Sequence, residues 1–99
     1  MCIRDRFNLS ACPDRFARIA LGMGIPDEGL STLEMGSRAI EVVKDLSKHL
    51  GIPENLKCLG VRREGFRAMT DDAMKSGNIP VNPRKTTHDD ILSLFDKAF

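Results

Sequence analysis

Asp45 and His49 are the first residues in this sequence whose types and spacing could do chemistry, because both side chains can bind a metal ion. They lie four residues apart in a segment predicted to be helical, so they would share one face of that helix. A metal site needs three or four ligands, however, and the other histidine, His88, begins a different predicted helix. We therefore interpret the pair as a surface interaction worth on the order of a few tenths of a kcal/mol.

The three cysteines, Cys2, Cys12 and Cys58, are an odd number and form no CxxC pair. This count argues against a disulfide framework and favours a reducing compartment. Cys58 lies between Leu56 and Leu59 in a short apolar segment that has no neighbouring histidine. We therefore predict that Cys58 is a buried structural thiol and not a nucleophile, and that Cys12 has the same role.

The segment NIPVNPRK is the third candidate, because its polar side chains lie on a stiffened loop. Pro80 and Pro83 are too close together for a helix and push the residues before them towards extended conformations. Loops of this kind on a rigid scaffold often carry function, and this one presents Asn78, Asn82 and Arg84. Two interpretations stay open: a functional loop, or a connector in which Arg84 pairs with a nearby carboxylate.

Helices must position these residues, because helical periodicity recurs along the chain and strand signals are almost absent. Pro13 suits the first turn of a helix that Gly24 would end. The clearest helix begins where Ser31 and Glu34 form a predicted capping box, and Gly51 ends it. Its apolar stripe, predicted to face a core, consists of Ala39, Val43, Leu46 and Leu50, with Val42 at its edge.

Two further helices are expected in the second half of the chain. One includes EGFRAMTDDAMKSG and ends at Gly77. Thr87 caps the other, with Asp89 and Asp90 in its favourable first turn. The sequence thus predicts an all-α fold of four to five short helices.

The charge balance argues against several classes of partner. Fifteen basic and fourteen acidic residues leave a net charge of +1 over 99 residues. Because the basic residues are also scattered, neither nucleic acid nor an anionic membrane is expected as a partner. No stretch suits a membrane span or a signal peptide, so we expect one small cytoplasmic domain.

Several motifs, taken in order, resemble the carboxy-terminal end of the iron-dependent (group III) alcohol dehydrogenases. They are FN at Phe7–Asn8, RFARIALGMG, EGLS, LGIPENLKCLGV, AMKSGNIPVNPRKTT and DDILSLFDKAF. The resemblance covers Phe7 to Phe99, and it depends on the order and spacing of the motifs together. Gly65 departs from the family pattern, in which this position usually carries an acidic residue.

The resemblance implies a two-domain enzyme: NAD or NADP binds an amino-terminal α/β domain, and a helical carboxy-terminal domain holds Fe2+ or Zn2+. The metal polarises the oxygen of a small-molecule alcohol or aldehyde during hydride transfer. The family's metal ligands, one aspartate and three histidines, are expected upstream of Phe7, so this chain would contain no metal ligand and no catalytic residue. Asn78 matches a position near the cofactor and substrate cleft. Asn82, Pro83 and Arg84 match a loop expected to brace the cleft wall.

We therefore expect residues 7–99 to be a fragment of that helical domain, inactive by itself, from a homo-oligomeric parent. Residues 1–6, MCIRDR, are expected to be translated sequencing adapter. The transposon end ATG-TGT-ATA-AGA-GAC-AG, used to prepare sequencing libraries, encodes Met-Cys-Ile-Arg-Asp, and its last two bases can begin an arginine codon. The alternative is a freestanding helical module that binds a protein partner. The substrate stays open, as does the subfamily, which includes maleylacetate reductases and hydroxyacid–oxoacid transhydrogenases.

Overall fold

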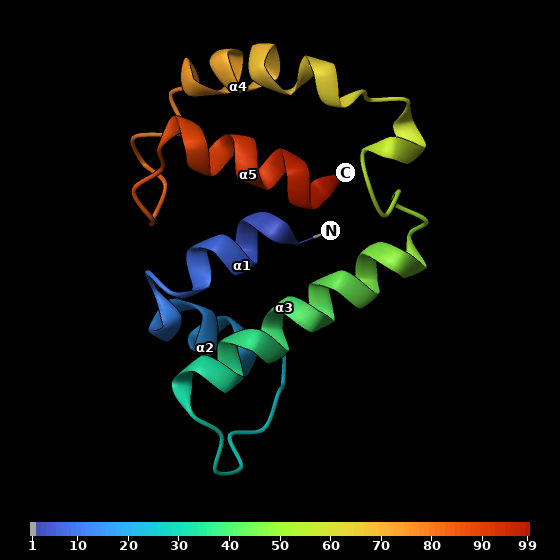
Figure 1. The fold of residues 1–99 in the computed structure, drawn as a ribbon. Coiled ribbons are helices and arrows are strands. Elements are labelled where there is room, and N and C mark those ends of the chain that lie inside the picture. The colour runs from blue at the N-terminus through green and yellow to red at the C-terminus, as the bar shows by residue number, and fades with distance from the viewer. Residues whose placement is uncertain (1) are drawn as a thin grey trace.

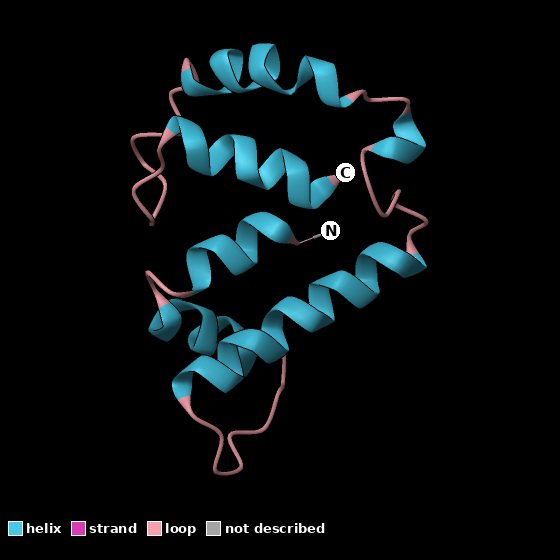
Figure 2. Cartoon of the chain, in the orientation of Figure 1, coloured by secondary structure: helices cyan, strands magenta, loops and turns pink. Residues whose placement is uncertain are grey.

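The structure, a computed structural model, describes residues 2–99 and contains helices and loops but no strand in that range (Figure 2). The predicted all-α class is thus confirmed. Sequence reasoning did not anticipate the first helix, and Met1 lies outside the described residues. The elements are α1 (Ile3–Leu9), α2 (Pro13–Gly22), α3 (Thr32–His49), η1 (Lys57–Leu59), η2 (Arg63–Gly65), α4 (Phe66–Met74) and α5 (His88–Ala98), where η marks a short 3-10 helix.

The helix starts follow the local chemistry of the sequence. Pro13 is the first residue of α2, and a proline is tolerated there because an N–H group in the first turn has no acceptor within the helix. At the start of α3, Ser31 Oγ accepts a hydrogen bond from Glu34 N at 3.1 Å, which is one half of the predicted capping box. At α5 the box is complete: Asp90 N donates to Thr87 Oγ1 at 3.2 Å, and Thr87 N donates to the Asp90 carboxylate at 2.9 Å.

The helices form two lobes, an N-terminal lobe of α1–α3 and a C-terminal lobe of α4 and α5 (Figure 1). In the N-terminal lobe, α2 packs against α3 around buried Ala20, Met35 and Ala39. Gly36 permits this close approach, because a Cβ atom there would lie 2.5 Å from Leu9 Cδ1 and 3.0 Å from Phe16 Cβ.

The C-terminal lobe is built around aromatic rings. Phe66, which is buried, stacks on Phe95 with ring centroids 5.7 Å apart and meets Phe99 edge-on at 5.6 Å. Thr70 is fully buried, and its hydroxyl donates to Phe66 O at 2.7 Å. The Arg63 guanidinium lies 4.6 Å from the centroid of the Phe99 ring. These contacts join α4 to the end of α5.

The apolar stripe of α3 is only half covered. Met35 and Ala39 are buried, whereas the residues Val42, Leu46 and Leu50 are 43%, 56% and 66% exposed. Helix α3 has 18 residues and α2 has 10, so α3 is longer by about 12 Å and extends beyond its neighbour. The prediction that the whole stripe faces a core is therefore wrong for Leu46 and Leu50.

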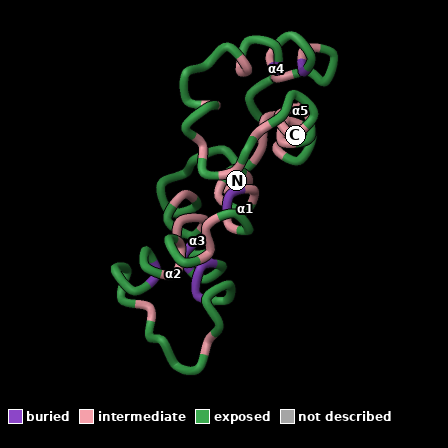
Figure 3. Tube along the Cα trace, turned by 90° about the vertical axis from the view of Figure 1, so that its left-hand side faces the viewer, coloured by how far each residue is buried: buried purple, intermediate pink, exposed green. Residues whose placement is uncertain are grey.

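The segment that joins the lobes lies at the surface, where Figure 3 shows mostly exposed chain. Cys58 is exposed, and its backbone N and its Sγ both donate to Asn55 Oδ1, at 3.0 and 3.1 Å. Leu59 is 62% exposed. The prediction of a buried thiol at Cys58 is thus wrong, because apolar neighbours in sequence do not bury a residue when no helix packs over the segment. Cys12 is half-buried.

Candidate functional site

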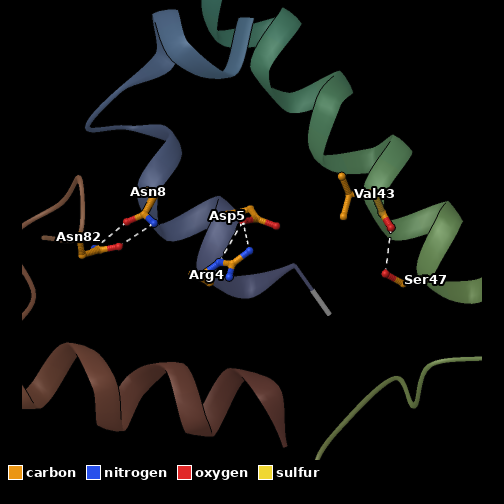
Figure 4. A network of polar contacts seen from close by, with 6 residues as sticks. All are labelled: Arg4, Asp5, Asn8, Val43, Ser47 and Asn82. Atoms are coloured by element: carbon orange, nitrogen blue, oxygen red, sulfur yellow. Dashed lines mark hydrogen bonds and ion pairs between the residues drawn. The ribbon is translucent and has the colours of Figure 1, made fainter. Parts of the chain in front are cut away.

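Two motifs that are far apart in the sequence meet between the lobes. Asn8, in the last turn of α1, is buried, and Asn82 lies in the proline-bearing loop before α5. Asn8 Nδ2 donates to Asn82 Oδ1 at 3.0 Å, and Asn82 Nδ2 donates to Asn8 Oδ1 at 2.8 Å (Figure 4). The two side chains therefore form a reciprocal amide pair across 74 residues of sequence.

Asn82 also fixes the shape of its own loop. Its Nδ2 lies 2.7 Å from Arg84 O and 3.1 Å from Thr86 Oγ1, so its two N–H groups are shared among these acceptors and Asn8 Oδ1. Thr86 Oγ1 in turn donates to Arg84 O at 2.9 Å. These bonds fix the conformation of the loop from within. The amide pair with Asn8 therefore attaches an already ordered turn to α1.

Arg84 binds the residue next to Asn8. Its Nη1 donates to Phe7 O at 2.9 Å, and its guanidinium lies 3.9 Å from the centroid of the Phe7 ring. Within residues 2–99 the Arg84 side chain forms no ion pair, so the connector interpretation is wrong in the partner it gave to Arg84. A backbone carbonyl and an aromatic face satisfy the guanidinium instead of a carboxylate.

A cavity of about 430 Å³ lies beside this contact, between α1 and α5. Arg6, Arg84 and Lys97 line it, with Asp90 as the one carboxylate among the lining residues. The pKa of Asp90 lies below its ordinary value of 3.8, first because Thr87 N donates to the carboxylate and then because of the Thr87 hydroxyl. The positive charge of Arg84 contributes less. This carboxylate is therefore held in its ionised form as a helix cap.

The other candidate residues take no part in these hydrogen bonds. Asn78 is exposed, and its backbone N donates to Ser76 Oγ at 3.3 Å; Pro83 is also exposed. Asp45 and His49 are both on the surface, as predicted, but His49 Nδ1 lies 2.8 Å from the backbone oxygen of Asp45 and not from its carboxylate. The structure therefore does not bring Asn78, Asp45 or His49 into the hydrogen bonds between Asn8 and Asn82, whereas Pro83 lies beside Asn82 in the loop.

Sequence reasoning identified both motifs at this contact but missed that they touch. The Phe7–Asn8 pair and the loop from Asn82 to Arg84 were recognised as two separate motifs. No local pattern links residues 74 positions apart, and the shared presence of the two motifs in one resemblance was the only available signal.

Residues 4–99 match the family model described as the C-terminal part of the Fe-containing alcohol dehydrogenase family. The chain belongs to the iron-containing alcohol dehydrogenase family. The 1,3-propanediol dehydrogenase of Klebsiella pneumoniae is 44% identical over 94 residues, which are 95% of this chain and 24% of that protein. Lactaldehyde reductase of Escherichia coli (strain K12) is 34% identical over 94 residues, which are 95% of this chain and 25% of that protein.

Two solved structures share the fold. A 1,3-propanediol oxidoreductase superposes with a TM-score of 0.90 at 43% identity, covering 96% of this chain and 25% of that one. An alcohol dehydrogenase from Oenococcus oeni also gives a TM-score of 0.90, at 40% identity, covering 98% and 25% of the two chains. The chain thus spans about a quarter of the length of the relatives it matches, and it corresponds to a helical part of them.

The family name implies iron, so the side chains of this chain can be tested as ligands. Among residues 2–99, no group of three or more His, Cys, Asp or Glu side chains lies close enough together to hold a metal ion. These residues therefore do not form an iron site by themselves. In the same range, no helix combines the length and the apolar character that crossing a membrane requires.

Proposed function

We propose that this chain is the C-terminal part of the helical domain of a metal-dependent, NAD(P)-linked alcohol dehydrogenase. The parent enzyme would interconvert alcohols and aldehydes or ketones by hydride transfer. The observation that carries the proposal is the combination of 44% identity to a 1,3-propanediol dehydrogenase with a TM-score of 0.90 to a 1,3-propanediol oxidoreductase. Further relatives are named as an NAD-dependent methanol dehydrogenase and an NADPH-dependent butanol dehydrogenase, which supports a nicotinamide cofactor of either kind.

In this enzyme the chain would shape the cleft, and the ligands of the metal would come from residues outside it. The amide pair of Asn8 and Asn82 and the contact of Arg84 with Phe7 hold the loop against α1. A wall made of this loop keeps its shape when substrate and cofactor enter, because its polar groups already bond to one another. Asn78, exposed at the start of the loop, is the residue that we propose faces the cleft.

We also propose that residues 7–99 belong to the dehydrogenase and that residues 1–6 are translated adapter, although the family match begins at residue 4. Sequencing the source DNA across this boundary tests the assignment. A genuine reading frame that continues upstream through MCIRDR into further dehydrogenase sequence would contradict the adapter and leave the function standing.

A graft into a whole enzyme tests the proposed function. Residues 7–99 would replace the matching C-terminal segment of the Klebsiella pneumoniae 1,3-propanediol dehydrogenase, with the same enzyme lacking that segment as the control. We expect the chimera to fold and oxidise 1,3-propanediol, and the truncated control to be inactive. A chimera that folds and retains its metal but oxidises no alcohol would contradict the proposal. The 99-residue chain alone is expected to show no alcohol oxidation and no stoichiometric Fe2+ binding.

A further inference from the structure

We infer that the exposed half of the α3 stripe is an internal packing surface, buried by the part of the dehydrogenase polypeptide that precedes the segment found in this chain. This surface, the distal stripe, consists of Val42, Leu46 and Leu50. The inference rests on the proposed function and adds to it the surface through which this chain joins the rest of the enzyme.

The distal stripe continues the stripe that is already buried. Met35, Ala39, Val42 and Leu46 follow one another at spacings of four, three and four residues, which places them on one face of the helix. Helix α2 covers the first two of them and then ends. Helix α5 does not cover the distal stripe, because it lies near the opposite face of α3. On that face Lys44 lines a cavity of about 410 Å³ together with Lys97 of α5.

The whole chain exposes more surface than a compact protein of its mass. Its accessible surface is 6860 Å² for 11.0 kDa, whereas a compact monomer of that mass exposes roughly 5,600 Å². The excess of roughly 1,200 Å² exceeds the roughly 800 Å² that each partner buries in a standard protein interface. The radius of gyration of 15.0 Å is also above the roughly 13 Å expected for this length. The excess exposed area is therefore of the size that a protein surface would bury, and is too large for a small ligand.

The solved relatives indicate which protein surface this is. The same arrangement of helices occurs with a TM-score of 0.90 inside a chain of which this one covers 25%. The open shape is therefore the shape that the segment has within a polypeptide about four times as long. The remaining three quarters of that polypeptide accompany the arrangement in the solved structure.

A matched pair of leucines tests the surface in the chimera described above. Leu46 and Leu33 both lie on α3 with similar exposure, 56% and 54%, but Leu33 lies on a different face. We expect Leu46→Asp to lower the melting temperature of the chimera by about 5–10 °C, because it buries an unpaired charge. Leu33→Asp should change it by no more than about 2 °C. In the 99-residue chain by itself, the two variants should differ only by the effect of the helix dipole, about 1 kcal/mol or less at each end, which favours Asp in the first turn of α3 and disfavours it in the last.

A milder variant keeps the test decisive if Leu46→Asp prevents folding. Leu46→Cys and Leu33→Cys would be treated with a thiol reagent, and mass spectrometry would read the labelling of each peptide. We expect Cys at position 46 to be protected in the folded chimera and labelled in the 99-residue chain, with position 33 labelled in both. Equal labelling of position 46 in the two proteins would overturn the inference.

Two other outcomes would also be decisive. If the 99-residue chain is a dimer that Leu46→Asp dissociates, a second copy covers the distal stripe and the inference is overturned. An active chimera in which position 46 stays accessible to the thiol reagent would overturn the packing surface and support the proposed function. A folded but inactive chimera in which position 46 is protected counts against the proposed function, and it leaves the packing surface supported.

Discussion

The side-chain amide of Asn82 connects the proline-bearing loop to α1. It pairs with Asn8, bonds the backbone of Arg84 and bonds the hydroxyl of Thr86. Within residues 2–99 no buried side-chain nitrogen or oxygen lacks a hydrogen-bond partner, so the network is complete as it stands. Removing one member of a complete buried network leaves another member unsatisfied, which costs more than the lost bond itself.

Asn82→Ala should therefore destabilise the chain by about 1–3 kcal/mol, because the buried amide of Asn8 loses its partner. Urea denaturation of the 99-residue chain, followed by helical circular dichroism, measures the change. Asn78→Ala is the control, since Asn78 is exposed, and it should change the free energy of unfolding by less than about 0.5 kcal/mol. Equal effects of the two substitutions would show that the amide pair carries no stability.

Asp90 should make the stability of α5 depend on pH in the acid range. Because its pKa in the folded chain lies below the ordinary 3.8, the carboxylate contributes stability above that value. This contribution is lost as the pH falls through the folded pKa, so unfolding should become easier below about pH 4. Denaturation curves between pH 3 and pH 6 measure this trend. Asp90→Asn should weaken the loss of stability below about pH 4, and Asp89→Asn should leave it unchanged. The reverse result would show that Asp90 is not the carboxylate responsible.

At the scale of single elements, helix starts could be predicted because their causes are local. A proline, a serine and a threonine at the right positions were enough for α2, α3 and α5. The exposure of Leu46 and Leu50 could not be predicted, because it depends on where α2 ends in space. The exposure of Cys58 depends in the same way on the absence of a covering helix. Periodicity therefore located the apolar faces, and only tertiary structure shows which of them are covered.

The same substitution should have opposite effects in two helices. Gly36→Ala places a Cβ atom 3.0 Å from Phe16 Cβ, which is fixed to the backbone of α2, so we expect overpacking to destabilise the chain by about 1–3 kcal/mol. Gly22→Ala meets nothing within 4 Å, so the higher helix propensity of alanine should stabilise it by up to about 1 kcal/mol. Thermal unfolding of both variants measures the two signs. A gain in stability for Gly36→Ala would show that α2 can move away from α3.

At the scale of the whole molecule, few contacts hold the two lobes together. They include the amide pair of Asn8 and Asn82 and the contact of Arg84 with Phe7. The sequence was sufficient to predict α2, α3, α4 and α5 and the family resemblance, but not α1. It could not predict the docking of the lobes, because each of these contacts joins residues that share no local pattern.

The amide pair has a further consequence for the order in which the molecule is made. On a ribosome that adds roughly 5–20 residues per second, Asn8 is synthesised roughly 4–15 s before the partner 74 positions later. Helices α2 and α3 can pair during that interval, since their contacts close only short loops. Asn8 must bond to water until Asn82 arrives. The lobes therefore join last. Until then the side-chain amide of Asn8, which is buried in the finished structure, stays solvated in the nascent N-terminal lobe.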